Sequence, residues 1–364
     1  MIIVETVPHS AYVPQLTTLF NLVFNKQWPS ELWAWKHLSN PLNEPNPSIV
    51  VALDDGRVVG ARPLLRVNLR YGGCLVKAAV PCDTMVHPNY RRHGLFSRMN
   101  ELAIETERAK GTALLFNFPN RISGAGYLKQ GWKEVTALRD LILMLNPRKV
   151  ARSAFDDSLL SGVAAAAFRV LLGGRAFRQR PATEGIVTAV CDRYADVPPG
   201  IPTLYDPHRI ELLRDSAFMV WRLDNNPIED HHYVVALDGG RLVGYMVLAV
   251  SRRLKGLKQG WILDCLVQDY DIHIFSSLIT TAVSLLGDLG CDYVRAWGVQ
   301  HPGFSAFLAR KMGFWAVPLP LLGRAAGDRL PRLVARPIAS EQLDDGKLLD
   351  ISNWNLSPLF RDPT

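Results

Sequence analysis

The same ten-residue segment occurs twice in this chain. Residues 51–60 read VALDDGRVVG and residues 235–244 read VALDGGRLVG, so eight of the ten positions are identical. Each segment is an apolar run, an Asp/Gly turn and a second apolar run, which predicts a β-hairpin. Trp35 upstream is matched by Trp221, and Lys129 downstream by Lys311, so the spacing stays near 180 to 186 residues throughout. A register kept over this length indicates two copies of one α/β unit.

The length of 364 residues also favours two domains, because single hydrophobic cores stop growing below this size. We predict one copy over residues 1–146, a second over 184–326, and between them a basic linker, 147–183. In the first copy we expect a central strand at about 75–86, a helix at about 95–109, a strand at 113–118 and a short helix at 124–129. The tail, residues 327–364, contains four prolines and is expected to wrap the surface.

The linker carries apolar residues at helical spacing from Leu160 to Leu171, beside several arginines. This pattern predicts a helix docked on a neighbouring domain. Peripheral contact with an anionic membrane surface is the alternative.

Composition narrows the class of ligand. The net charge of +7 favours anionic ligands. The sequence has no Lys/Arg tract interleaved with aromatic residues, so we do not expect nucleic-acid binding. The five cysteines form no CxxC pair, so we expect neither a disulfide framework nor a metal site. The N-terminus has no signal-peptide pattern, and no apolar run approaches the roughly 20 residues that span a bilayer. We therefore expect a soluble, cytoplasmic protein of unknown oligomeric state.

One segment, residues 86–97, has the pattern of an anion site. An apolar strand ends at Val86, a Pro-Asn turn follows, and Arg91, Arg92 and Gly94 precede the predicted helix. The first N–H groups of a helix lack intrahelical partners and carry partial positive charge, and the two arginines add full charges. This arrangement predicts a socket for a diphosphate.

The segment resembles the acyl-CoA-binding loop of the GNAT acetyltransferase superfamily. Phe96 departs from the pattern, because glycine or alanine is usual there. A second segment, residues 120–132, resembles the closing motif of the same superfamily. The matching positions in the two segments are Val86, Pro88, Tyr90, Arg91, Gly94, Asn120, Tyr127, Lys129 and Gly131. Because both motifs occur in the expected order, the chain is identified as a GNAT member.

The resemblance implies an α/β (α+β) fold of two tandem GNAT domains, each a mixed, mostly antiparallel sheet flanked by helices. It also implies an enzyme that uses acetyl-CoA as cosubstrate, with Tyr127 as the acid that protonates the departing thiolate. The backbone of Met85 and Val86 would hold the pantetheine arm and the thioester oxygen. The other residues expected to bind CoA are Arg91, Arg92, His93, Gly94, Leu95, Phe96, Ser97 and Asn120.

The general base is a separate question. Asp83 stands two residues before Met85 and is able to take the amine proton directly or through water. Its counterpart in the second copy is Asp264, so a structural role in both copies is an equal alternative.

The second copy has lost the residues that the chemistry needs. The segment 267–276 has neither arginine nor glycine, and Asp269 and Asp271 would repel phosphate. Ala309 stands at the position of Tyr127 and Pro302 at that of Asn120. The first copy is therefore the catalytic candidate. The second is a degenerate partner that can form one side of the acceptor site.

We expect acetyl transfer to a primary amine by direct attack in a ternary complex, since no nucleophilic Cys or Ser stands out. Likeness to acetyltransferases associated with bacterial polysaccharide and cell-envelope genes makes an amino sugar a plausible acceptor. Two alternatives stay open: an aminoacyl-tRNA-dependent transferase of the peptidoglycan-bridge type, and a non-catalytic acyl-CoA sensor.

Overall fold

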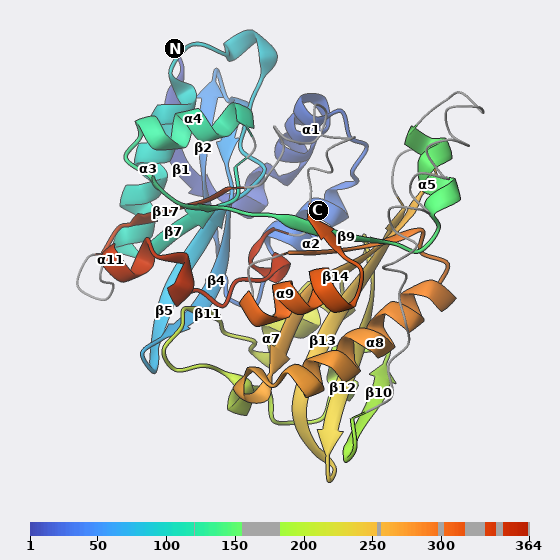
Figure 1. Ribbon diagram of the computed structural model, residues 1–364. Coiled ribbons are helices and arrows are strands. Elements are labelled where there is room, and N and C mark those ends of the chain that lie inside the picture. Colours follow the sequence, from blue (N-terminus) through green and yellow to red (C-terminus); the bar gives the residue numbers. More distant parts are fainter. Residues whose placement is uncertain are drawn as a thin grey trace.

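The computed structural model describes residues 1–119, 121–154, 183–252, 256–297, 302–316, 332–339 and 345–362. The elements of the first copy are β1 (Ile3–Pro8), α1 (Val13–Phe24), α2 (Ser30–His37), β2 (Ser48–Asp54), β3 (Arg57–Arg62), β4 (Leu64–Tyr71), β5 (Cys74–Pro81), β6 (Met85–Val86), α3 (Leu95–Ala109), β7 (Leu114–Asn117), α4 (Arg121–Lys129) and β8 (Lys133–Ala137). They are drawn in blue to green in Figure 1, above and to the left of the second copy.

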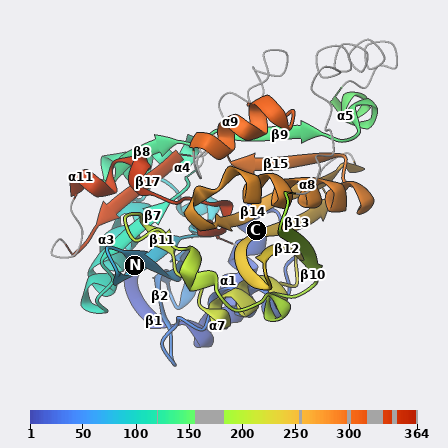
Figure 2. The same cartoon turned by 60° about the horizontal axis from the view of Figure 1, so that its bottom comes forward.

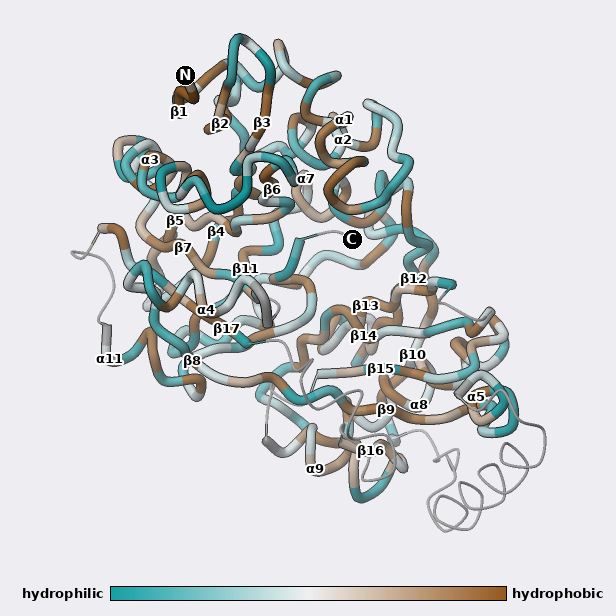
Figure 3. Tube along the Cα trace, turned by 90° about the horizontal axis from the view of Figure 1, so that it is seen from above, coloured by the Kyte–Doolittle hydropathy of each residue, from teal (hydrophilic) through white to brown (hydrophobic). Residues whose placement is uncertain are grey.

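The second copy repeats this order with β10 (Ile186–Cys191), β11 (Glu211–Leu212), α7 (Ser216–Met219), β12 (Asp230–Asp238), β13 (Arg241–Arg252), β14 (Lys258–Val267), α8 (Ile272–Asp288), β15 (Tyr293–Trp297), α9 (Pro302–Lys311) and β16 (Trp315–Ala316). Between the copies lie β9 (Asp140–Met144) and α5 (Pro147–Ala154), and the chain ends with β17 (Arg332–Pro337) and α11 (Asp345–Leu348). Figure 3 shows hydrophobic residues (brown) along the strands of both copies.

The repeated segment folds as predicted. β2 pairs with β3 and β12 with β13, and each antiparallel pair has an irregularity at the same position, after Ala52 and after Ala236. Both turns have two residues at positive φ, Asp55–Gly56 and Gly239–Gly240, as a tight hairpin requires. The helix predicted at 95–109 is α3, and Gly111 follows it at φ 78°. The prediction of two related α/β units is confirmed.

The two copies exchange a strand. β17, from the C-terminal part of the chain, lies between β7 and β8 of the first copy. β9, which follows the first copy, lies between β15 and β16 of the second. Figures 1 and 2 show β9 extending across to the second copy beside β15, with β17 beside β7. β11 of the second copy also pairs with β4 of the first. The six-stranded and the seven-stranded sheet therefore each depend on hydrogen bonds from the other copy, whereas the four-stranded sheet β1-β2-β3-β6 contains, among the described residues, first-copy strands only.

The expectation that the tail wraps the surface is wrong for the residues that the structure describes. β17 lies inside a sheet, and Trp354, Leu356 and Phe360 are almost fully buried. The prolines predict irregular chain, yet Pro337 only ends β17. Leu333, Val334 and Ala335 are buried, so both faces of this strand are covered. The apolar linker stripe at 160–171 lies outside the described residues. No helix in the described part of the chain is long and apolar enough to cross a membrane.

The strand predicted at 75–86 is interrupted. β5 pairs with β4 and β7, whereas β6 pairs with β3, and between them Asp83 adopts a positive φ of 45°. β6 is the outer strand of its four-stranded sheet, so one backbone edge of Met85 and Val86 has no strand partner among the described residues. The corresponding strand of the second copy, β14, is continuous over ten residues. The opening in the sheet therefore belongs to the copy that carries the motifs.

Candidate active site

The predicted diphosphate socket is a turn followed by the start of α3. A 3₁₀ turn, Pro88–Tyr90, precedes it, and the Tyr90 hydroxyl donates to Asp54 on β2 over 2.8 Å. Arg92 and Gly94 both adopt φ 69°, and Gly94 caps α3 without a side chain. The N–H groups of the first turn therefore face outward, a geometry that suits an anion.

Most side chains around these N–H groups are exposed to solvent, and one is buried in the core. We call the segment from Arg91 to Ser97, at the start of α3, the cradle. Its exposed side chains are those of Arg91, Arg92, His93 and Ser97, whereas Leu95 is buried and packs α3 against the sheet. The loop thus offers backbone donors and cationic side chains on the same exposed surface. This is the composition expected of a site that holds the diphosphate of CoA.

Phe96 packs away from the cradle. Its ring meets the Tyr127 ring edge-on, with centroids 5.7 Å apart, and lies against α4 at Gly126. A Cβ at Gly126 would approach Phe96 Cε1 to 3.3 Å. The bulky residue at this position therefore fills the space between α3 and α4 and leaves its backbone at the helix start.

Tyr127 is held by two donors. Its side chain is 2 % exposed, and its hydroxyl oxygen accepts from Arg62 Nη1 at 2.9 Å and from Asn117 Nδ2 at 2.7 Å. The backbone N–H of Phe118 donates to Asn117 Oδ1, which fixes the orientation of that amide. With its oxygen accepting two hydrogen bonds, Tyr127 keeps its own O–H for a third partner. The phenol is therefore arranged as a proton donor.

Asp83 is the centre of a buried ion pair. Its Oδ2 lies 2.7 Å from Lys36 Nζ and 3.0 Å from His37 Nε2. Burial raises the pKa of Asp83, but the Lys36 ammonium and the His37 hydrogen bond outweigh it and hold that pKa well below its usual range. Asp83 is thus an ionised, paired carboxylate and a weak proton acceptor.

Asp264 has the equivalent position in the second copy and an equivalent pairing. Arg214 donates to both of its oxygens, at 2.7 and 2.8 Å, and Tyr245 donates to Oδ2. The alternative weighed above, an acid kept for structure in both copies, agrees with this geometry.

His37, Cys82 and Asp83 form a cluster of potential metal ligands, whose ligand atoms lie within 4.8 Å of one another. The Lys36 ammonium already provides the cation at this carboxylate. Burial raises the pKa of the Cys82 thiol well above its ordinary value, which disfavours the thiolate that metal binding or nucleophilic attack needs.

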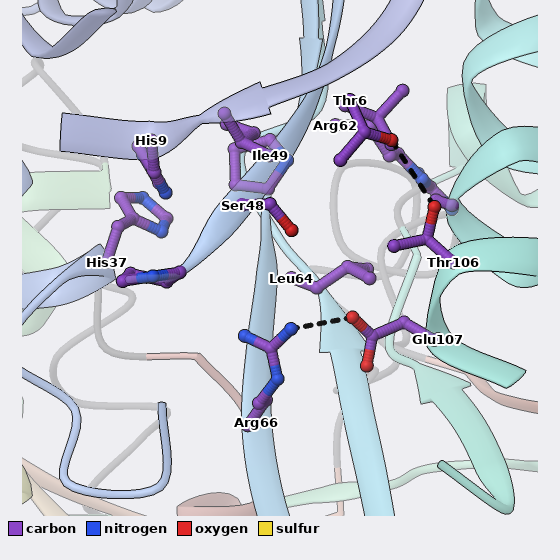
Figure 4. Close-up of a pocket in the computed structure, with 14 residues that line it drawn as sticks. Thr6, His9, His37, Ser48, Ile49, Arg62, Leu64, Arg66, Thr106 and Glu107 are labelled. Atoms are coloured by element: carbon purple, nitrogen blue, oxygen red, sulfur yellow. Dashed lines mark hydrogen bonds and ion pairs between the residues drawn. The ribbon is translucent and has the colours of Figure 1, made fainter. Parts of the chain in front are cut away.

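Next to these residues is the polar cavity of Figure 4. Arg66 reaches across it to Glu107 at 2.7 Å, and His9 and His37 lie on the opposite side. Burial lowers the pKa of His9 to about 3 and also lowers that of His37, so both imidazoles are neutral at pH 7. Arg62 also lines this cavity and connects it to Tyr127.

The structure brings most of the predicted residues together and adds others. Asn120 lies outside the described residues. Arg62, Asn117 and Lys36 were not identified from the sequence. A usable signal existed for Arg62, because it is the only charged residue in the apolar run 58–65.

The comparisons with known proteins concern the first copy and the overall fold. A model of the acetyltransferase (GNAT) domain matches residues 8–135, which include the cradle and Tyr127. No curated protein sequence matches the chain.

Three solved structures resemble nearly the whole chain, each at 14 % identity. A GCN5-related N-acetyltransferase from Anabaena variabilis has a TM-score of 0.62 and covers 92 % of this chain and 73 % of its own. A conserved protein of unknown function and probable N-acyltransferase from Enterococcus faecalis has a TM-score of 0.61 and covers 93 % and 73 %. Eis1 from Mycobacterium abscessus has a TM-score of 0.53 and covers 96 % and 76 %.

At this identity the structural likeness establishes the fold alone, and the domain match applies to residues 8–135. The chain therefore contains an acetyltransferase (GNAT) domain at residues 8–135 and has, over nearly its whole length, a fold built from two GNAT-like copies.

Proposed function

We propose that the first copy transfers an acetyl group from acetyl-CoA to the primary amine of a small acceptor, with an amino sugar as the favoured class. The observation that carries the proposal is the Tyr127 hydroxyl, which accepts from Arg62 and Asn117 and keeps its proton to donate. A thiolate leaving a thioester needs such an acid.

The proposed course begins with the diphosphate of CoA on the N–H groups of α3, beside Arg91 and Arg92. The unpaired edge of β6 then takes the pantetheine arm and the thioester oxygen. The neutral amine attacks the thioester carbon, a C–N bond forms, the C–S bond breaks, and Tyr127 protonates the sulfur. Direct attack is favoured because the buried Cys82 thiol is a poor nucleophile.

The attacking amine loses a proton as it becomes the amide. The sequence predicts Asp83 as the acceptor of this proton, directly or through water. Its pairs with Lys36 and His37 make Asp83 a weak base and favour release of the proton to water.

The second copy supports a composite acceptor site. Phe118, next to Asn117, packs against Trp297 at the end of β15, with ring centroids 5.3 Å apart. The side of the site beyond β7 is therefore bordered by the degenerate copy. We propose that acceptor selection depends on residues of both copies.

The experiment measures thiol release from acetyl-CoA with a panel of amino sugars and other primary amines. We expect Tyr127→Phe to lower kcat by about 10²–10⁴-fold while CoA binding by calorimetry is kept. Tyr71→Phe, on β4, is the matched control and should leave kcat unchanged.

The outcome also separates the two alternatives. Binding of acetyl-CoA without acetylation of any amine would support a sensor. Failure to bind CoA, together with binding of aminoacyl-tRNA, would support the peptidoglycan-bridge type of transferase.

A further inference from the structure

Arg62 is a buried guanidinium that connects three parts of the site. It ends β3, is 1 % exposed, and has Pro63 directly after it. Its Nη1 donates to Thr84 Oγ1 at 2.7 Å and to the Tyr127 hydroxyl at 2.9 Å, and its Nη2 donates to Asn100 Oδ1 at 2.6 Å. Thr84 immediately precedes β6, Asn100 lies on α3 and Tyr127 on α4, so this side chain touches each element proposed to hold CoA.

None of the carboxylates in the described part of the chain forms an ion pair with Arg62, whose hydrogen-bond partners are all neutral. Arg214, which is equally buried, pairs with Asp264, and half-buried Arg66 pairs with Glu107. The guanidinium carbon of Arg62 lies 5.3 Å from the centre of the Phe96 ring and 5.2 Å from that of Tyr127. A buried, unpaired cation is costly, so its presence indicates an anion that forms beside it.

The second copy supplies an independent observation. The residue 184 positions after Arg62, in the repeated hairpin strand, is Met246, which is buried in the apolar core. The position of Tyr127 is occupied there by Ala309. The arginine and the tyrosine are therefore absent together from the copy that has lost the motifs, although the hairpin around the arginine position is kept.

We propose that Arg62 is a positioning residue for Tyr127 and the electrostatic partner of its phenolate. This inference rests on the proposed function, in which Tyr127 is the acid. When the C–S bond breaks, its electron pair goes to sulfur, the Tyr127 O–H bond breaks and an S–H bond forms. The negative charge then resides on the Tyr127 oxygen, opposite Arg62 Nη1, until the proton that the acylated nitrogen releases reaches that oxygen through water. Before that step, the hydrogen bonds from Arg62 and Asn117 keep the O–H directed at the ligand.

The test is a double-mutant cycle on thiol release from acetyl-CoA, measured with the fastest amine of the panel, or with water as acceptor if no amine accelerates release. Arg62→Met introduces the residue of the second copy. We expect it to lower kcat by about 10–100-fold, with the acetyl-CoA KM and the CoA dissociation constant within about threefold. In the Tyr127→Phe background the same change should lower kcat by no more than about twofold, because the group it acts through is gone.

Two further variants guard against a purely structural effect. Arg62→Lys keeps the charge and should retain part of the kcat. Arg62→Ala should regain rate with added ethylguanidinium, and the Arg62→Ala, Tyr127→Phe double variant should not. Arg57→Met, exposed at the start of β3, is the matched control and should behave as wild type. Unfolding in urea checks that each variant is folded.

The outcomes are distinguishable. Equal losses from Arg62→Met with and without the Tyr127 hydroxyl would overturn the role of Arg62 and leave the proposed function standing. An unchanged kcat in Tyr127→Phe alone would instead overturn the proposed function, and this inference with it.

Discussion

Trp35 and Trp221 form two reciprocal hydrogen bonds. Trp35 Nε1 donates to the carbonyl oxygen of Trp221 at 3.3 Å, and Trp221 Nε1 donates to the carbonyl oxygen of Trp35 at 3.0 Å. The two residues occupy the same position in the two copies, 186 residues apart. A reciprocal contact between equivalent residues is what a two-fold symmetry axis between the two copies produces. With the exchange of β9 and β17, it makes the pair of copies the unit that folds.

Removing either indole donor should therefore weaken the whole molecule. We expect Trp35→Phe and Trp221→Phe each to lower the free energy of unfolding by about 1–2 kcal/mol, because each leaves a part-buried carbonyl without its donor. Urea unfolding followed by circular dichroism should stay a single transition. Two separate transitions, one for each copy, would contradict the interlocked fold.

Fragments 1–154 and 183–364 should depend on each other. Each lacks a strand that the other supplies to the interior of its sheet, so each alone exposes strand edges prone to aggregation. We expect either fragment expressed alone to be insoluble, and the two co-expressed to purify as a complex that binds CoA. A soluble, folded 1–154 fragment would show that β17 is dispensable.

Three substitutions at Gly94 separate charge from shape. A Cβ there meets nothing within 4 Å, but the φ of 69° disfavours other residues. Gly94→Ala should therefore cost stability by about 1 kcal/mol and leave CoA binding largely intact. Gly94→Glu places a carboxylate at the diphosphate cradle and should abolish CoA binding. Gly94→Gln is the size-matched neutral control, and calorimetry in which Gln and Glu weaken binding equally would argue against an anion site.

Asp83 and its counterpart allow a matched test of the general base. Asp83→Asn and Asp264→Asn both break a buried ion pair, so both should lower the free energy of unfolding by about 3–5 kcal/mol. We expect the kcat of folded Asp83→Asn to stay within about tenfold of wild type, because the pKa of Asp83 is lowered by its partners. A fall of a hundredfold or more in Asp83→Asn alone would identify Asp83 as the base.

Two buried histidines should make the protein sensitive to mild acid. Burial lowers the pKa of His9 and of His231 to about 3, against an ordinary value of 6.5. Between pH 6.5 and 3 the unfolded chain binds more protons than the folded one, so stability is complete above pH 6.5 and is lost as the pH falls. At pH 5 the loss is about 2 kcal/mol per histidine. Urea unfolding across this range should show it, and His231→Gln should remove about half. A stability curve that is flat from pH 7 to 5 would contradict buried neutral histidines.

The sequence by itself determined the local structure of this protein. The Asp/Gly turns, the helix that begins after Gly94 and ends before Gly111, and the position of Tyr127 on a short helix were predictable, because turn chemistry and hydrophobic period act within a few residues. The repeat added the relation between the copies and showed which one keeps the motifs. The family motifs supplied the expected chemistry.

Only the tertiary structure decided which strands pair and which charges meet. A short apolar strand such as β17, in which Leu333, Val334 and Ala335 are all buried, is recognisable as a core segment. Its sequence does not show which sheet receives it, so the exchange with β9 left no sequence signal. The pairing of Lys36 with Asp83 and of Arg62 with Tyr127 joins residues 47 and 65 positions apart. These contacts turned Asp83 from a candidate base into a paired carboxylate and gave Tyr127 a cation beside its hydroxyl. They follow from long-range packing, which no local pattern specifies.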